Sequence, residues 1–388
     1  MVVRKHFIHP IKELAENGKL TGLLLILSTI FSLMLSNSDY GDSYLKLWNT
    51  EIGFAFMHKS ILHWINDGLM VVFFLMVGLE IKREILEGEL STRKQVILPV
   101  VAAFGGILSP ALIFFLFNSR DPENLHGWAI PTATDIAFSL GILTLLGNRV
   151  PFALKIFLTA LAIIDDLGAI LIIAIFYTME MHFKMILFAA LVFIILMIMN
   201  KMRVKKLYFF LLPGVALWYF VLKSGIHPTV AGVLLAFTIP VDILGDLEHR
   251  LNKPVNYIIL PLFALANTAI PVSLEQAGNL IAPLSLGIIL GLFIGKPAGV
   301  ILASFLAVRF RFASLPDGIN WKQTLGLGMT AGIGFTMSIF IASLSFESDS
   351  ALALAKLAIL VGSLISAIAG MAILWYATTK DQALDFNE

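Results

Sequence analysis

The sequence predicts an all-α polytopic membrane protein, on the evidence of its hydrophobicity, its low charge and its recurring apolar runs. Hydrophobic residues make up 58% of the 388 residues and charged residues only 14%, whereas a soluble domain carries roughly 25% charge. Apolar runs of about 18 or more residues recur along the chain, and each is long enough to cross a bilayer as a helix. The composition therefore predicts a lipid environment along the whole length.

We expect about twelve transmembrane helices with short connections, so that residues 1–388 form a single membrane transport domain. The expected spans are 20–36, 61–81, 96–117, 127–147, 152–177, 183–200, 207–222, 226–240, 255–271, 284–308, 325–345 and 355–377. The first is expected to be an uncleaved helix, because no clear small-x-small cleavage site follows it. The separation of the seventh span from the eighth is the least certain, because only Lys223–Pro228 lies between them.

The basic residues predict the orientation of the chain. Twenty of the 27 Lys and Arg residues fall in the connections of one side, and six fall on the other. An excess of Lys and Arg marks the cytoplasmic side. We therefore expect an even number of spans with both termini in the cytoplasm.

Charge and cysteine content exclude several functional classes. The net charge of +1 is too small to indicate a nucleic-acid partner. The chain has no cysteine, which excludes disulfides, iron–sulfur clusters and thiol chemistry. We expect no cofactor.

The connection from Ser36 to Ser60 is longer than the others on the outer side. Its segment Leu47–Phe54 is compatible either with a short hairpin or with an ordered loop. The sequence leaves these two alternatives open.

Two adjacent carboxylates, Asp165 and Asp166, lie in an otherwise apolar span. An ionisable residue inside a membrane is costly and indicates function. Neighbours on a helix point about 100° apart, so the two acids can serve different partners. Lys296 is the base expected within a span, which suggests a carboxylate–lysine pair and a second carboxylate for a small cation or a proton. The alternative is a purely structural buried salt bridge.

Two spans contain predicted interruptions. Pro131 breaks the helical ladder just before Thr134 and Asp135, and Gly332 and Gly334 weaken the helix near the C-terminus. Interrupted helices at matching positions indicate a midplane binding site in transporters with inverted repeats. An acid at such a break can offset positive helix ends; the alternative is a simple proline kink capped by Thr and Asp.

Glycines recur at every fourth position ahead of Lys296, namely Gly287, Gly291, Gly295 and Gly299. They form one smooth helix face for close packing, with or without a link to function. The sequence Gly295-Lys296 is not a phosphate loop, because Pro297 stands at the Ser/Thr position.

Several ionisable residues at span ends are candidates for sensing pH. His227 lies at the outer end of a short span, where a histidine is either structural or pH-responsive. On the cytoplasmic side the charged residues either cluster or form ordinary solvated loop charge; they are Glu80, Lys82, Arg83, Glu84, Glu248 and His249.

Together these residues make the chain resemble the NhaA family of bacterial sodium/proton antiporters. The matching stretches run in order along nearly the whole chain: Trp64–Asp67, Val77–Glu80, Pro131–Phe138, Ala162–Ile170, Lys223–His227, Ile294–Pro297 and Gly332–Ile341. The resemblance implies twelve helices as inverted repeats, with the interrupted fourth and eleventh helices crossing at the midplane. It implies a multi-pass protein of the bacterial inner membrane.

The resemblance also implies roles for individual residues. Asp166 would bind Na+ or Li+, Asp165 would assist or exchange protons while paired with Lys296, and Thr134 would be an oxygen ligand. Asp135 and Lys296 would balance the helix ends.

Family members extrude sodium electrogenically in exchange for protons and become active at alkaline pH. Glu80, Arg83, Glu84, Glu248 and His249 match the family's cytoplasmic pH-sensing region, although Asn252 departs from it and the loop 242–247 is short. The family also forms homodimers through an outer hairpin, which would be residues 47–54 here.

Two other classes of function are alternatives to sodium/proton exchange. Intramembrane aspartyl proteases also use two acids, but their Gly-x-Gly-Asp signature is absent, and Asp165 and Asp166 share one helix. A passive cation channel would conduct sodium without a proton moving in the opposite direction.

Overall fold

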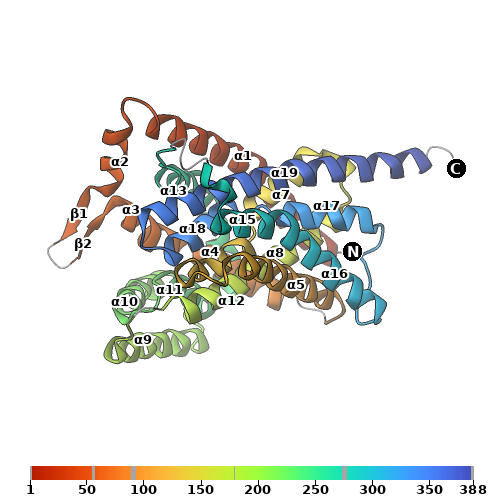
Figure 1. The fold of residues 1–388 in the computed structure, drawn as a ribbon. Helices are drawn as coiled ribbons and strands as arrows, with labels where there is room; N and C mark the ends of the chain where they lie inside the picture. Colours follow the sequence, from red (N-terminus) through yellow and green to blue (C-terminus); the bar gives the residue numbers. More distant parts are fainter. Residues whose placement is uncertain (1, 55–56, 89–92, 179, 273–277, 386–388) are drawn as a thin grey trace. The chain divides into compact units, whose positions relative to one another are not determined.

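The computed structural model describes residues 2–54, 57–88, 93–178, 180–272 and 278–385 (Figure 1). The chain divides into two compact units. Unit 1 comprises Met1–Leu24, Gly88–Ala169 and Val272–Glu388, and unit 2 comprises Leu25–Glu87 and Ile170–Pro271. Two of the boundaries fall within the continuous helices α1 (Val2–Ser36) and α8 (Phe152–Phe176). Each unit is therefore assembled from segments that are distant in the sequence.

Unit 1 contains most of the long apolar helices. Besides parts of α1 and α8, its elements are α5 (Arg93–Asn118), α6 (Pro122–Leu125), η3 (His126–Thr132), α7 (Ile136–Leu145), η4 (Gly147–Arg149), η6 (Asn279–Ile281), α15 (Pro283–Leu290), η7 (Gly291–Gly295), α16 (Lys296–Arg309), α17 (Trp321–Ala331), α18 (Phe335–Ser345) and α19 (Asp349–Asp385). Helix α16 packs along α5, and α17 packs along α19 (Figure 1). Leu143, Leu158, Leu161, Val300 and Leu327 are fully buried in the core between these helices.

Unit 2 combines helices with one hairpin. Besides the remaining parts of α1 and α8, its elements are α2 (Gly41–Asn49), β1 (Glu51–Phe54), β2 (Met57–Ser60), α3 (Ile61–Trp64), η1 (Ile65–Leu69), α4 (Met70–Leu86), α9 (Phe183–Lys201), α10 (Tyr208–Ser224), α11 (Thr229–Thr238), α12 (Val241–Pro254), η5 (Val255–Ile259) and α13 (Leu260–Asn267). The core brings together α4, α9, α10 and α11, with Leu79, Leu196, Phe210 and Ala236 fully buried.

The long connection predicted from Ser36 to Ser60 contains a hairpin. Strands β1 and β2 pair antiparallel, with Glu51 opposite Ser60 and Ile52 opposite Lys59. The hairpin begins later than the predicted segment, because residues 47–49 complete helix α2. Short paired strands and a preceding helix satisfy backbone groups that an irregular loop would leave to water.

The all-helical membrane fold predicted from the sequence is confirmed. In the described part of the chain, six helices are long and apolar enough to cross a membrane, or up to nine if each of three bent pairs is one span. Two further predicted spans coincide with the shorter apolar helices α10 and α11, and another coincides with η5 and α13.

The uncertain boundary between the seventh and eighth predicted spans is a helix end at Gly225. This glycine has a φ of 91°, in the left-handed region, and ends α10. A residue without a Cβ adopts this conformation readily, so α10 and α11 are separate helices.

The glycine-rich face of α15–α16 packs on α5. A Cβ placed on Gly299 would lie 2.0 Å from the carbonyl oxygen of Gly105, and one on Gly295 would lie 2.7 Å from the Cα of Pro110. The two helices are therefore in contact through their backbones, which side chains at these positions would prevent.

Candidate functional site

Both predicted interruptions are present, and both lie in unit 1. The first separates η3 from α7, which are bent by 42°, and the second separates α17 from α18, which are bent by 44°. Ala133 is extended at the first break, with φ −81° and ψ 152°. The two breaks contact each other, because the backbone N–H of Asp135 donates to the carbonyl oxygen of Ile333 at 2.7 Å.

One carboxylate caps the helices that restart after both breaks. Asp135 is 2% exposed and accepts hydrogen bonds from the backbone N–H of Phe138 (3.0 Å), at the start of α7. It also accepts from the backbone N–H and the hydroxyl of Thr336 (3.1 and 2.5 Å), at the start of α18. Helix N-termini carry unpaired donors and partial positive charge, so one buried anion stabilises two of them.

The carbonyl groups that end the broken helices are also satisfied. Hydroxyls of Thr134 and Ser139 donate to the carbonyl oxygens of Ala331 and Thr330, each at 2.8 Å. The hydroxyl of Ser338 donates to Ile130 at 2.7 Å. The crossing is therefore held by side chains that replace the missing helical hydrogen bonds.

Lys296 supplies the positive charge at this crossing. Its side chain is fully buried, and Nζ donates to the carbonyl oxygen of Thr132 at 2.5 Å, where η3 ends. It is the first residue of α16 and follows the π-helical turn η7; such turns are frequent at functional sites. Its aliphatic stem passes Gly106, where a Cβ would lie 3.5 Å from Cε.

The two adjacent acids lie on α8 and are each 2% exposed. Asp165 Oδ2 lies 2.6 Å from Lys296 Nζ and accepts the Thr134 hydroxyl at 2.8 Å. Its other oxygen, Oδ1, is buried and has no hydrogen-bond partner among the described residues. Asp166 is the next residue on the helix and points in a different direction, about 100° away.

This arrangement offers oxygen ligands to a small cation in a site without direct access to water. Carboxylate, hydroxyl and backbone carbonyl oxygens are the groups that coordinate Na+ or exchange protons at the broken helices of transporters. The positive charge of Lys296 offsets one of the two carboxylates, which lowers the electrostatic cost of burying both.

The predicted pH-sensing residues Glu80, Arg83, Glu84, Glu248 and His249 form a group between the end of α4 and the middle of α12, in unit 2. Arg83 lies 3.0 Å from Glu84 and 3.4 Å from Glu248. Glu80 is 6% exposed on the preceding turn of α4. His249 is exposed beside Glu248.

Lys82 makes contacts of another kind. Its ammonium donates to the carbonyl oxygens of Phe237 (2.8 Å) and Ile239, at the end of α11. Its positive charge thus stabilises a helix C-terminus.

His227 contacts Asp67, an acid within the predicted span 61–81. Its Nε2 lies 3.5 Å from Asp67, and its Nδ1 lies 2.8 Å from the hydroxyl of Thr229. Asp67 also lies 3.4 Å from His63 Nε2. This histidine and carboxylate group belongs to unit 2 and is separate in the chain from the acids of α8.

Sequence reasoning did not identify Thr336 or the carbonyl oxygen of Thr132 as parts of the site. Thr336 had a weak signal, because it is a hydroxyl residue two positions after Gly334, at the predicted interruption. The Thr132 carbonyl had none, since a backbone acceptor is not distinguished by residue type.

Comparison with known proteins gives matches over nearly the whole chain. Residues 12–374 match the family model described as Na+/H+ antiporter 1. The Na(+)/H(+) antiporter NhaA 2 of Flavobacterium johnsoniae is 52% identical over 380 residues, covering 95% of this chain and 92% of the relative. The NhaA antiporters of Flavobacterium psychrophilum and Bordetella parapertussis are 50% and 48% identical, covering 94% and 92% of this chain and 95% and 93% of the relatives.

Replacing Asp135 by alanine should strongly destabilise the fold. The change removes three hydrogen bonds to a buried carboxylate, and bonds to charged groups contribute about 1.5–3 kcal/mol each. We expect a loss of about 3 kcal/mol or more, measured as a lower thermal unfolding midpoint of the purified protein. Ser139→Ala is the control, because it removes one neutral hydrogen bond worth about 1 kcal/mol. Equal shifts for the two variants would contradict the capping argument.

Proposed function

Since the chain belongs to the Na+/H+ antiporter 1 family, we propose that it exchanges sodium for protons across a membrane. We further propose that it extrudes Na+ or Li+ electrogenically and that its activity depends on pH. The observation that best supports this proposal is the buried ion pair of Asp165 and Lys296, with Asp166 next to it in the sequence. The second carboxylate oxygen of Asp165, Oδ1, has no hydrogen-bond partner among the described residues and can accept a cation or a proton.

We propose that Na+ and H+ compete for the same two carboxylates. A protonated carboxylate has lost the negative charge that attracts Na+, and a carboxylate that binds Na+ disfavours a proton. Asp166 is assigned as the principal cation ligand, with Thr134 contributing its hydroxyl oxygen, and Asp165 as the proton-exchanging partner of Lys296. Two interacting carboxylates titrate as a pair, so the pH dependence belongs to both.

Alternating access would follow from movement of the broken helices. Both breaks and all the ion-site residues belong to unit 1, so rocking of this unit would move the complete site. Helices that restart inside a membrane allow a fixed site to face one side and then the other.

The ionic group around Arg83 is proposed to set the pH profile. The side chains of Arg83, Glu84 and Glu248 are 12–18% exposed, so water can exchange protons with the group. The hairpin β1–β2 is proposed to form the homodimer contact, because its edge strands carry unpaired backbone groups that can pair with a second copy.

Loss of the Asp166 carboxylate should abolish exchange. In everted vesicles with a preformed proton gradient, adding Na+ should collapse the gradient in the wild type but not in Asp166→Asn, which keeps the shape and removes the charge. Asp246→Asn on the exposed face of α12 is the matched control and should retain full activity.

Retention of full exchange by Asp166→Asn at equal expression would reject the proposed role. Sodium uptake by the wild type without any change in the proton gradient would instead indicate a channel.

Removing the charge of Lys296 should shift the pH profile. Without a cation at 2.6 Å, the acid pair holds protons more strongly, and Na+ competes only at higher pH. We expect the half-maximal exchange of Lys296→Ala and Lys296→Gln to move upwards by about 1 pH unit, measured in the vesicle assay across a pH series.

The glutamine variant separates charge from hydrogen bonding, because its amide can still donate to the Thr132 carbonyl. It should therefore unfold at a higher temperature than Lys296→Ala. A wild-type pH profile in both variants would remove the argument for the ion pair.

Glu248→Gln should move the pH profile in the opposite direction. Removing one negative charge from the group around Arg83 weakens its attraction for protons, so activation should occur at lower pH, by about 0.5–1 unit. Asp246→Asn, on the same helix but exposed, controls for a general change in surface charge. An unchanged midpoint, or the same shift in both variants, would exclude this group as the pH sensor.

A further inference from the structure

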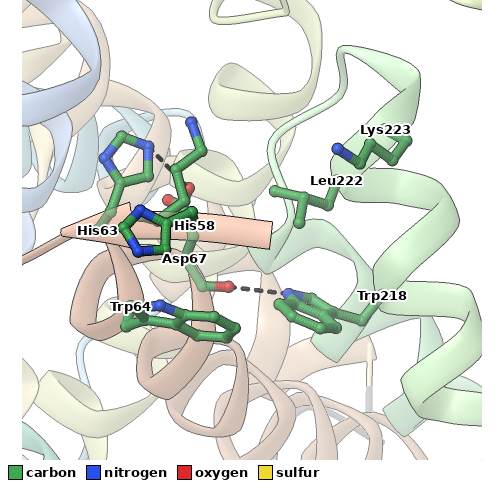
Figure 2. A pocket seen from close by; sticks show the side chains of 8 residues that line it. His58, His63, Trp64, Asp67, Trp218, Leu222 and Lys223 are labelled. Carbon is green, nitrogen blue, oxygen red and sulfur yellow. Dashed lines mark hydrogen bonds and ion pairs between the residues drawn. The ribbon is translucent and has the colours of Figure 1, made fainter. Parts of the chain in front are cut away.

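A second polar site lies in unit 2, in a pocket that the ion-transport proposal does not use (Figure 2). Its volume is about 290 Å³, just below the range of about 300–1,000 Å³ for small-molecule sites. Residues of the hairpin and the first turns of the following helix line one side, and the last turns of α10 line the other; they are His58, Lys59, His63, Trp64, Asp67, Trp218, Leu222 and Lys223.

The pocket is formed where apolar helices end. Ile61–Leu86 is one of the candidate membrane spans and begins at the pocket, and the shorter apolar helix Tyr208–Ser224 ends there. The ends of spanning segments lie at the depth of lipid headgroups, where Trp side chains are enriched and Lys side chains near helix ends extend to the interface. The position therefore favours an occupant that belongs to the bilayer surface.

Two tryptophans form a fixed aromatic wall. The indole N–H of Trp218 donates to the carbonyl oxygen of Asp67 at 2.9 Å, and that of Trp64 donates to Ile52 at 3.0 Å. The ring centroids are 6.4 Å apart. Because both indole donors are already used by the backbone, the wall offers ring surface to an apolar or cationic group and no further N–H donor.

The charged side chains are separated by sign. The ammonium groups of Lys59 and Lys223 come from opposite sides of the pocket and are exposed. The carboxylate of Asp67 lies between His63 and His227, at 3.4 and 3.5 Å, and its side chain is only 20% exposed. His58 is engaged by Glu51 at 2.8 Å.

We propose that this pocket binds the headgroup of a zwitterionic phospholipid that carries a phosphate and a primary ammonium, of the phosphatidylethanolamine type. The phosphate would be held by Lys59 and Lys223, and the ammonium would donate hydrogen bonds to Asp67 beside the ring faces of Trp64 and Trp218. An ammonium with N–H groups matches a carboxylate acceptor, whereas a quaternary choline has no hydrogen to donate.

The proposal is separate from the proposed ion site, because the pocket residues belong to unit 2 and the acids of α8 belong to unit 1. It predicts that one lipid headgroup binds specifically in this pocket through complementary charges. Such binding differs from the non-specific attraction of lysines to anionic membranes.

The test measures binding of dioctanoyl-phosphatidylethanolamine to the purified full-length protein by native mass spectrometry, with the shift in thermal unfolding as a second readout. The same chains with a choline or a glycerol headgroup, and free phosphoethanolamine, are the comparison ligands. The variants are Asp67→Asn and the double variant Lys59→Gln with Lys223→Gln. Lys46→Gln is the control, because Lys46 is exposed on α2 and does not line the pocket.

We expect the wild type and Lys46→Gln to bind the ethanolamine lipid about tenfold more tightly than the choline lipid, since one charge-assisted hydrogen bond contributes about 1.5 kcal/mol. Asp67→Asn should lose this preference, and the double lysine variant should bind both lipids about tenfold more weakly. The exposed lysines can be replaced without disturbing the core, so the second variant remains informative if Asp67→Asn unfolds.

Three results would overturn the proposal: equal binding of the ethanolamine and choline lipids by the wild type, wild-type affinity in the double lysine variant, or tighter binding of the glycerol lipid. Free phosphoethanolamine that binds as tightly as the lipid would show that the occupant is a soluble zwitterion and would reject the lipid.

Discussion

The site depends on one constraint: where a helix is interrupted in an apolar medium, the backbone N–H and C=O groups at its ends need hydrogen-bond partners within the protein. Water is not available to those ends, and unsatisfied backbone groups there cost several kcal/mol each. Asp135 accepts hydrogen bonds from the N-termini of two helices, and Lys296 donates one to the Thr132 carbonyl. The two opposite charges are thus fixed by the geometry of the breaks before any transported ion is considered.

The acids of α8 take their environment from this framework. The ammonium of Lys296 is shared between the Thr132 carbonyl and Asp165, and the Thr134 hydroxyl lies 2.8 Å from both Asp165 and the Ala331 carbonyl. One hydroxyl hydrogen cannot be fully directed at two acceptors. Asp165 therefore shares both of its donors, Lys296 Nζ and the Thr134 hydroxyl, with the carbonyl groups that end the two interrupted helices.

The sequence was sufficient to predict the helical fold and to single out the charged residues, because both follow from the same physical quantity, the cost of exposing polar groups to lipid. It could not decide between a hairpin and a loop after α2, since strand pairing depends on register between segments. It also could not show that Lys82 donates a hydrogen bond to a carbonyl at the end of α11, whereas Arg83, the next residue, forms an ion pair with Glu248. Partners that are backbone carbonyls carry no signature of residue type, so only coordinates reveal them.

The contact of Gly105 with Gly299 restricts both positions. A Cβ at either position would lie 2.0–2.3 Å from a carbonyl oxygen of the other helix, far inside van der Waals contact. While α5 and α16 keep this spacing, both positions therefore accept only glycine. The place of α16, the helix that begins with Lys296, is thus set by residues that have no side chain.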